Sequence, residues 1–529
     1  MDLSRADHAV SPPRIVIPHP YNAADDLIER NLRAGRAGKL AYIDDRTQVT
    51  YAELAARVNR AGNALLALGL VPEQRVVVAL HDSIDFPTVF LGAIKAGIVP
   101  IAVNTLLPAR DYRYILDDSR ASALIVSPPL LPMFEQALAD GGRTAVREII
   151  VAGDAGPPYR RLDEMLAAAS DALLPSPTTG DDACFWLYSS GSTGAPKGTV
   201  HAHASMIQTA ELYARPVLGI CEDDIVFSAA KLFFAYGLGN ALSFPLCVGA
   251  TTVLMAERPT PAAVFKRLAL HRPTVFYGVP TLFAAMLAAP DFPARDALNL
   301  RRCASAGEPL PADIGRRFRE RAGVDILDGI GSTEMLHIFL SNRADDVRYG
   351  TTGVPVPGYE LRIVDEQGHD VADGEQGELL IKGPTAAMTY WNNRTKSRAT
   401  FLGEWTRSGD KYRRDDSGYY IYCGRNDDML KVGGIWVSPV EVEAAIITHP
   451  AVLEAAVVAW EDADRLVKPK AVVVLRPDRT ANGTLAVEIQ EHVKQQLAPY
   501  KYPRWVEFVA ELPKTATGKI QRYKLRTSR

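Results

Sequence analysis

The sequence has few cysteines and no dense run of like charge. Its five cysteines are scattered through 529 residues and form no C-x-x-C pair: Cys184, Cys221, Cys247, Cys303 and Cys423. This usage argues against a disulfide framework or a zinc site and is typical of a reduced, cytoplasmic protein. The 59 basic and 62 acidic residues nearly balance, for a net charge of −3. We therefore expect no nucleic-acid partner.

The sequence also lacks a clear membrane-directing segment. The first nine residues carry Asp2, Arg5 and Asp7 without an apolar core, so we expect no signal peptide. The stretch 232–256 contains no charged residue and is long enough to span a membrane. However, several glycines and Pro245 interrupt it. This favours short buried elements joined by turns, and no membrane partner.

A chain of this length is too long for one hydrophobic core and predicts two or more domains. Thr50 and Glu53 form a capping-box pattern that opens a helix, and Gly69 ends it. Further patterns predict strands at 75–80, 98–103, 122–126, 251–255, 274–277 and 301–305, and helices at 86–96, 109–118 and 261–271. This alternation indicates βαβ units and an α/β fold with doubly wound sheets.

The composition changes twice toward the C-terminus. Residues 353–425 are rich in Gly, Asp and Thr and predict a β-rich subdomain. Beyond it, Ser438 and Glu441 form a capping-box pattern that predicts a helix start, and 466–475 alternates like a strand. Apolar residues four apart predict a second helix: Leu485, Ile489, Val493 and Leu497. We interpret residues 1–425 as a large domain and 426–529 as a small α+β domain.

The stretch 188–198 carries the strongest chemical signal. It follows a predicted strand at 184–188 and concentrates hydroxyls, glycines and a lysine: Ser189, Ser190, Gly191, Ser192, Thr193, Gly194 and Lys197. Hydroxyls, backbone amides and a lysine are typical ligands of phosphate oxygens. A Walker loop does not fit, because Pro196 stands at its second glycine and Gly198 replaces its Ser or Thr. A flexible linker needs neither the lysine nor the strand.

Two more polar loops follow apolar strands farther along the chain. One is 306–309, and the other is the glycine-rich stretch 328–334. Ligands of parallel sheets bind at the carboxyl ends of the strands, where such loops lie. Glu334 is the candidate Mg²⁺ ligand, because Mg²⁺ on a nucleotide needs only one or two protein carboxylates.

Taken in order, five motifs resemble the adenylate-forming superfamily of acyl-CoA synthetases, peptide-synthetase adenylation domains and beetle luciferase. They are 188–198, Ser332–Glu334, Trp405–Asp410, Gly424–Asp427 and Lys514–Lys519, so the resemblance covers essentially the whole chain. Within the superfamily, Lys231–Gly239 and Ser332–Ile338 are similar to the corresponding stretches of benzoate–CoA ligases.

This resemblance implies that a carboxylate attacks the α-phosphate of ATP and that coenzyme A then displaces AMP to give a thioester. It assigns Lys519 to the carboxylate, Thr333 to the α-phosphate and Glu334 to Mg²⁺. The loop from Ser189 to Lys197 would hold the departing phosphates. Adenine and ribose would lie against Gly307, Glu308, Pro309, Asp328, Gly329, Ile330, Asp410 and Arg425. The small domain would rotate about Asp427, and CoA would approach along Lys431, Gly433 and Gly434.

Several of these residues also have ordinary structural interpretations. Lys519 can be a solvated charge, Asp410 a turn cap and Arg425 a partner in a surface ion pair. Glu308 fits a structural role as readily as adenine binding. Ile330 departs from the family, because many relatives carry at this position a tyrosine that stacks on the base.

The resemblance places the acyl pocket at Phe234, Ala235, Tyr236, Ala306, Gly331, His337 and Ile338. Amino-acid-activating relatives carry an aspartate where this chain has Ala235, so a substrate ammonium would be left unpaired here. Small residues leave a flat slot that Tyr236 and Ile338 can close around a ring. His337 either donates to the carboxylate or fills a wall.

The sequence therefore predicts a cytoplasmic, ATP- and Mg²⁺-dependent aryl-acid–CoA ligase that acts on benzoate. One alternative is an enzyme that adenylates an aryl acid and loads it on a carrier-protein phosphopantetheine arm. Another is a catalytically inactive nucleotide-binding protein on the same fold, against which the intact motifs argue. The oligomeric state stays open, with a homodimer among the possibilities.

Overall fold

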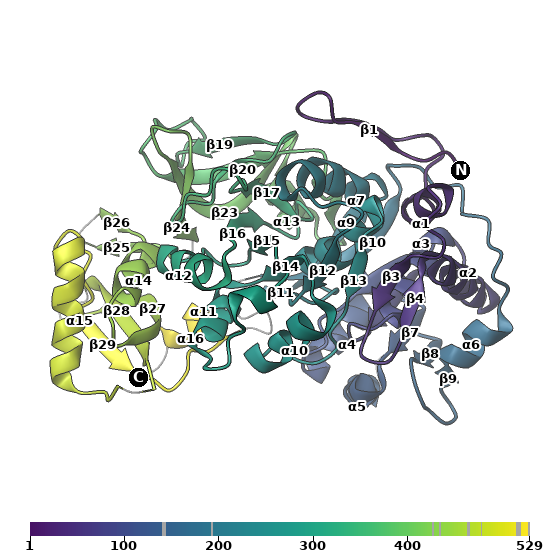
Figure 1. Ribbon diagram of the computed structural model, residues 1–529, viewed down its shortest axis with the longest axis horizontal. Helices are drawn as coiled ribbons and strands as arrows, with labels where there is room; N and C mark the ends of the chain where they lie inside the picture. The colour runs from purple at the N-terminus through teal and green to yellow at the C-terminus, as the bar shows by residue number, and fades with distance from the viewer. Residues whose placement is uncertain are drawn as a thin grey trace.

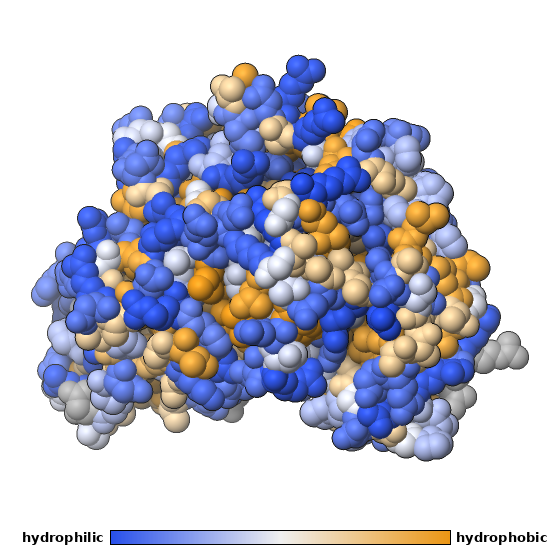
Figure 2. Space-filling model, turned by 45° about the vertical axis from the view of Figure 1, so that its right-hand side comes forward, coloured by the Kyte–Doolittle hydropathy of each residue, from blue (hydrophilic) through white to orange (hydrophobic). Residues whose placement is uncertain are grey.

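The computed structural model describes residues 1–139, 144–191, 194–425, 428–432, 435–462, 466–477, 479–514 and 520–526. Figure 1 shows the N-terminal elements, in purple, toward one end of the molecule and the C-terminal elements, in yellow, at the other. Polar residues cover most of the face drawn in Figure 2, and apolar residues gather in patches across its middle. The mixture of sheets and helices confirms the predicted α/β class.

The first large sheet carries the glycine-rich hairpin. Among the described residues its order is β21–β11–β10–β6–β5–β7–β8–β9. The strands are β5 (Arg75–Ala79), β6 (Val99–Ala102), β7 (Ala123–Val126), β8 (Glu148–Val151), β9 (Arg160–Arg161), β10 (Ala183–Gly191), β11 (Gly194–Ala202) and β21 (Thr389–Tyr390). The neighbours β10, β6, β5, β7, β8 and β9 run parallel, and β11 returns antiparallel to β10. The strands and helices predicted between residues 75 and 126 are confirmed, with α3 (Asp85–Lys95) and α4 (Ala109–Ser119).

The second large sheet carries the two other predicted loops. In the described part of the chain its order is β18–β17–β16–β15–β14–β12–β13–β3–β4. The strands are β3 (Leu40–Ile43), β4 (Gln48–Thr50), β12 (Ile225–Ser228), β13 (Thr251–Val253), β14 (Val275–Gly278), β15 (Arg302–Ser305), β16 (Ile326–Gly331), β17 (Ile338–Ser341) and β18 (Val354–Pro355). The accompanying helices are α10 (Pro261–His271), α11 (Pro280–Ala288) and α12 (Ala312–Ala322), of which α10 has the predicted bounds.

Helices and apolar side chains join the two sheets into one body. The core that contains Val76 of β5 also contains Tyr42 of β3 and Leu327 of β16. Helix α2 (Tyr51–Ala67), whose Leu54 and Val58 belong to this core, starts with the predicted capping box of Thr50 and Glu53. The other helices of this region are α1 (Ala23–Arg33), α5 (Leu131–Ala139), α6 (Leu162–Ala168), α7 (Ala204–Thr209) and a π-helical segment (Ala210–Leu218). An N-terminal hairpin, β1 (Arg5–Asp7) and β2 (Arg14–Val16), runs along the outside (Figure 1).

The uncharged stretch 232–256 folds into short buried pieces, as predicted. It forms α8 (Ala235–Leu238), a π-helical segment (Gly239–Ser243), α9 (Phe244–Val248) and β13. No helix among the described residues is long and apolar enough to cross a membrane.

The predicted β-rich subdomain is a smaller antiparallel sheet. It consists of β19 (Glu360–Val364), β20 (Gly377–Lys382), β22 (Phe401–Leu402), β23 (Trp405–Arg414) and β24 (Tyr420–Arg425), with α13 (Arg394–Thr400) beside it. This segment is not separate from the first sheet, because β21, which lies within it, pairs with β11.

The C-terminal elements have an apolar core of their own. They are β25 (Leu430–Val432), β26 (Ile435–Val437), α14 (Pro439–Ile447), β27 (Val452–Glu461), β28 (Val467–Leu475), α15 (Gly483–Gln496), β29 (Trp505–Phe508) and α16 (Arg522–Leu525). Ile446 of α14, Val473 of β28 and Ile489 of α15 belong to that core. Ser438 caps α14, but the Glu441 carboxylate pairs with the Lys501 ammonium at 2.7 Å, so no capping box forms.

Candidate functional site

The predicted phosphate loop is a β-hairpin. β10 continues three residues past the predicted strand, and β11 returns so that Ser189 lies opposite Lys197. The Ser189 hydroxyl is buried without a hydrogen-bond partner among the described residues. Ser192 and Thr193, at the tip, lie outside the described residues, and only the backbone is described for Ser190, Gly191 and Gly194.

Lys197 and Glu334 meet at one place, although one lies on a hairpin of the first sheet and the other follows β16 of the second. The Lys197 Nζ lies 3.9 Å from Glu334 Oε1. Tyr390 of β21 stands between them: its hydroxyl donates to Glu334 Oε1 at 2.6 Å and accepts from Lys197 Nζ at 3.4 Å. Burial lowers the pKa of Lys197, and the neighbouring carboxylate of Glu334 opposes this shift.

The loop that carries Thr333 is fixed through its backbone. His201 of β11 donates from Nε2 to the Thr333 carbonyl at 2.8 Å. Burial lowers the pKa of His201 to about 4, so the ring stays neutral near pH 7. From the other side, the Ala387 N–H donates to the Glu334 carbonyl at 2.7 Å. The turn that carries Thr333 and Glu334 is thus fixed by hydrogen bonds from β11 and from the β-rich subdomain.

The predicted adenine-binding residues lie at neighbouring strand ends. β15 and β16 are adjacent and parallel, which brings Gly307–Pro309 beside Asp328–Ile330. Asp328 is buried; its Oδ2 accepts from the Leu310 N–H at 3.3 Å, and its Oδ1 has no partner among the described residues. Burial raises the pKa of Asp328 well above its ordinary value. The carboxylate of Glu308 accepts from the Ile520 N–H at 3.0 Å.

Glu308 therefore contacts the C-terminal segment directly after Lys519. Lys519 itself, Asp427, Gly433 and Gly434 lie outside the described residues, and only the backbone of Lys431 is described. On either side of 515–519, the chain is anchored by the Lys514–Glu454 ion pair at 2.7 Å and by three Arg522–Glu443 hydrogen bonds of 2.8, 3.0 and 3.2 Å.

The predicted ribose ligands are partners across two strands. Asp410 of β23 lies opposite Arg425 of β24, and their side chains form an ion pair at 3.3 Å. Gly409 has φ +74°, a conformation that favours glycine. The structure thus contains an Asp410–Arg425 ion pair, which agrees with the structural interpretation of Arg425. A role of these two residues in ribose binding stays a prediction.

Of the predicted acyl residues, Tyr236 and Gly331 lie next to His337, whose ring is buried. The Nε2 of His337 lies 3.2 Å from both the Tyr236 carbonyl and Asn240 Oδ1. Burial lowers the pKa of His337 to about 3. Because a carbonyl can only accept, Nε2 carries the single proton of this neutral ring, and Nδ1 is an acceptor. His337 is therefore unsuited to donate a hydrogen bond to a substrate carboxylate.

The other predicted acyl residues belong to, or pack against, the apolar core that contains Phe244. Phe234, Ala235 and Tyr236 are half-buried at the start of α8, and Ala306 and Ile338 are buried. A methyl group on Gly331 would lie 2.5 Å from the His337 carbonyl oxygen, so no larger residue fits there without movement of the strands. This close approach explains the glycine at that position.

Sequence patterns gave no indication of several residues in this region. Tyr213 lies on a π-helical segment and Tyr277 on β14, and their buried hydroxyls, like that of Tyr236, have no partner among the described residues. The Phe244 ring packs 4.5 Å from the His337 ring. Tyr213, Tyr277 and Phe244, like Tyr390, belong to none of the motifs, and single apolar or aromatic positions carry no distinguishing signal.

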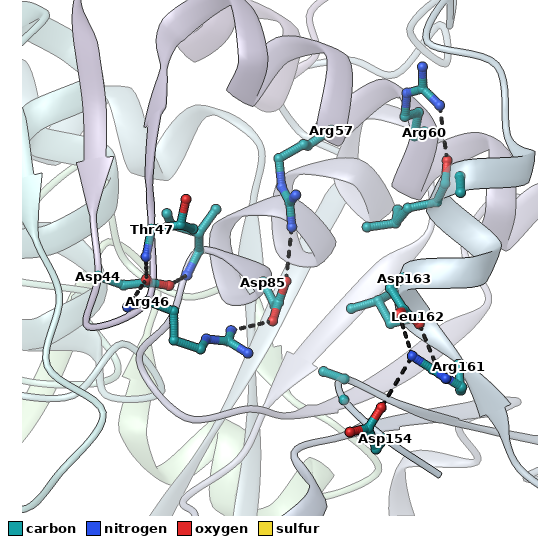
Figure 3. Close-up of a pocket in the computed structure, with 15 residues that line it drawn as sticks. Asp44, Arg46, Thr47, Arg57, Arg60, Asp85, Asp154, Arg161, Leu162 and Asp163 are labelled. Carbon is teal, nitrogen blue, oxygen red and sulfur yellow. Dashed lines mark hydrogen bonds and ion pairs between the residues drawn. The ribbon is translucent and has the colours of Figure 1, made fainter. Parts of the chain in front are cut away.

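A cavity of about 680 Å³ lies elsewhere, between the turn after β3, α2 and α6 (Figure 3). Its described lining includes Arg46, Arg57 and Arg161 but none of the predicted site residues. Both Arg46 and Arg57 pair with Asp85, at 2.9 and 3.0 Å. Arg161 likewise pairs with carboxylates. The cavity is thus charge-compensated and is not the predicted site.

Comparison with known proteins agrees with the arrangement of these motifs. The family described as AMP-binding enzyme matches residues 28–391, and the AMP-binding enzyme C-terminal domain matches 441–519. Benzoate–CoA ligase of Thauera aromatica is 64% identical over 99% of both chains. A 4-hydroxybenzoate–CoA/benzoate–CoA ligase of Rhodopseudomonas palustris is 52% identical over 96% of this chain and 94% of the relative. The crystal structure of a benzoate CoA ligase from Burkholderia xenovorans is 56% identical with a TM-score of 0.90, covering 96% of this chain and all of that one. The chain belongs to the AMP-binding enzyme family.

Proposed function

We propose that this protein is an ATP-dependent aryl-acid–CoA ligase whose substrate is benzoate. The observation that carries the proposal is the composition of the predicted acyl region: it combines Tyr236, a neutral His337 and Ile338 with small residues, and it has alanine at position 235 in place of a charged side chain. An apolar acid of ring size fits such a region. The printed functions of the Thauera and Rhodopseudomonas relatives support the same substrate class.

The reaction has two steps. A carboxylate oxygen attacks the α-phosphorus of ATP, an acyl-adenylate forms and pyrophosphate leaves. The thiol sulfur of CoA, having lost its proton, then attacks the acyl carbon, a thioester forms and AMP leaves. The first step brings two anions together, so positive charge and hydrogen-bond donors must lie where negative charge develops.

The described residues suit these demands. Lys197 supplies a cation at the hairpin that we assign to the β,γ-phosphates, and Thr333 has its backbone fixed for the α-phosphate. Glu334 offers one carboxylate, a donor set that fits Mg²⁺ sharing phosphate oxygens and water. When bound, Mg²⁺ would neutralise phosphate charge. Asp410 with Arg425 and the strand ends at 307–309 and 328–330 would hold the nucleoside.

The small domain, residues 426–529, would supply the remaining groups. We assign Lys519 to the adenylation step, Asp427 to the hinge, and Lys431, Gly433 and Gly434 to the CoA path. The contact between Glu308 and the Ile520 N–H supports this proposal, because it brings the backbone next to Lys519 to the predicted adenine loop.

Pyrophosphate release across aryl, alkyl and amino acids tests the substrate class. We expect benzoate and small ring-substituted benzoates to give the highest kcat/KM. Equal turnover of a long-chain fatty acid would contradict the aryl assignment. Incubation with free CoA tests the acceptor: benzoyl-CoA should form without a carrier protein, and its absence in an enzyme that still releases pyrophosphate would favour carrier-protein loading.

A further inference from the structure

Tyr390 occupies a position between the two charged residues of the proposed nucleotide site. It is 2% exposed, and its backbone pairs with Thr199 of β11, two residues after Lys197. Its N–H donates to the Ser397 hydroxyl at 3.1 Å, and its ring packs 5.2 Å from that of Phe401. The ring is therefore held by neighbours other than Lys197 and Glu334.

The hydroxyl of Tyr390 has one hydrogen, and the contacts show where it points. Glu334 Oε1 can only accept, so the 2.6 Å contact is a donation from the tyrosine. The oxygen can then accept from Lys197 Nζ at 3.4 Å. Burial and the Glu334 carboxylate raise the pKa of Tyr390, so the hydroxyl remains a donor at neutral pH.

The aromatic face of Tyr390 adds a second restraint. Lys197 Nζ lies 4.5 Å from the ring centroid, within range of a cation–π interaction. The ammonium thus contacts the ring and hydroxyl of Tyr390 and stays 3.9 Å from the carboxylate. A charged pair without this spacer would close to a hydrogen bond of about 2.8 Å. The ammonium would then occupy the side of the carboxylate that a cation needs.

We propose that Tyr390 is a positioning residue that keeps the Lys197 ammonium and the Glu334 carboxylate from pairing directly, so that the carboxylate remains available to Mg²⁺ and the ammonium to the nucleotide phosphates. The inference rests on the proposed function, because it assumes that Lys197 and Glu334 bind MgATP. It adds Tyr390 of β21 to the pair of Lys197, on the hairpin, and Glu334, on the loop after β16. Removal of the hydroxyl should let the pair close and weaken cation binding.

The test measures ATP binding without aryl acid, so that no turnover is needed. Calorimetric titrations with excess Mg²⁺ and with EDTA give the factor by which Mg²⁺ strengthens ATP binding. Loss of a residue that orients a metal ligand lowers metal affinity by about 10- to 100-fold. We therefore expect Tyr390→Phe to reduce the Mg²⁺ factor by at least about 10-fold and to leave ATP binding in EDTA little changed.

Tyr349→Phe is the matched control, because its hydroxyl also donates to a carboxylate, Asp325, at 2.7 Å. It should keep the wild-type Mg²⁺ factor. A wild-type factor in Tyr390→Phe, combined with loss of the factor in Glu334→Gln, would overturn the inference and leave the proposed function intact. A wild-type factor in Glu334→Gln would instead refute the assignment of Glu334 to Mg²⁺.

Lys197→Met is a second test of the separation, because it removes the ammonium of the pair. It can be made even if Tyr390→Phe fails to fold. If Tyr390 already holds the charges apart, removal of the ammonium should weaken ATP binding in EDTA but leave the Mg²⁺ factor unchanged. A Mg²⁺ factor that rises in Lys197→Met would show that Lys197 competes directly for Glu334, and would overturn the spacer role.

Discussion

Asp82 should make the stability of the protein depend on pH, because its carboxyl is buried against the backbone of Leu232. It lies just after β5 and is 3% exposed. Its two oxygens accept from the Leu232 N–H at 3.2 and 3.4 Å, at the start of the segment that leads to Tyr236. Burial raises the pKa of Asp82 to about 6, although the Lys231 ammonium and the Leu232 N–H oppose the shift.

The size of this pH-dependent change in stability follows from the pKa values of Asp82 in the unfolded and folded states. A carboxyl whose pKa rises from 3.8 to about 6 binds its proton more tightly in the folded state. The full pKa difference corresponds to about 3 kcal/mol of folding free energy. This stabilisation is fully present below about pH 4 and is lost as the pH rises through 6. Between pH 5 and pH 8 the loss is about 1.4 kcal/mol. For a body of roughly 400 residues, this is about 2 °C in Tm.

The variant Asp82→Asn isolates this contribution, since its amide oxygen can still accept from the Leu232 N–H but does not titrate. Scanning calorimetry of both proteins at pH 5 and pH 8 gives the difference in Tm at each pH. We expect the variant to gain about 2 °C on the wild type between pH 5 and pH 8. Asp154→Asn, at a fully exposed side chain, should show no such change. A difference between Asp82→Asn and the wild type that stays constant with pH would refute the reasoning.

Two further substitutions test the acyl wall and the small domain. In Gly331→Ala the new methyl group would lie 2.5 Å from the His337 carbonyl oxygen and 2.6 Å from its carbon, so β16 and β17 must separate. We expect a loss of about 1–3 kcal/mol in stability and of about 100-fold in kcat/KM for benzoate. The control Gly38→Ala, whose new methyl group would have no atom within 4 Å, should match the wild type. Wild-type kinetics in Gly331→Ala would exclude Gly331 from the wall of the acyl pocket. Arg522→Met leaves the buried Glu443 carboxylate without its guanidinium, at a cost of about 3–5 kcal/mol. Limited proteolysis should then cut the C-terminal region first. The control Arg160→Met, which breaks an exposed ion pair at 2.7 Å, should change protease resistance little. Equal protease resistance of the two variants would argue against a stabilising role for the buried Arg522–Glu443 pair.

Local patterns predicted the regular elements because short-range contacts determine them. The capping box at Thr50 and Glu53 and the proline that begins α10 lie within one helical turn of the residues they affect. The capping box predicted at Ser438 was only half right. Lys501, sixty residues farther along the chain, takes the Glu441 carboxylate instead.

The composition of the site was less predictable, because its contacts join distant parts of the chain. The second strand of the hairpin at 189–197 also pairs with β21, which lies almost two hundred residues away. Tyr390 and Asp82 lack a motif, and their roles follow only from contacts with Glu334 and Leu232. The direction of the His337 proton likewise depends on the Tyr236 carbonyl, which no sequence pattern reveals.

The pairing of β21 with β11 has a consequence for hybrid proteins assembled from two parents. A junction between residues 202 and 389 would place the lysine-bearing hairpin and its tyrosine-bearing edge strand in different parental sequences. The contact between Lys197 and Tyr390 would then join side chains that come from two different parents. A junction after β24, at Arg425, keeps every described strand of both large sheets in a single parent. Keeping the contact between Lys197 and Tyr390 within one parent thus favours a junction after β24, even though the β-rich segment looks like a separate unit in the sequence.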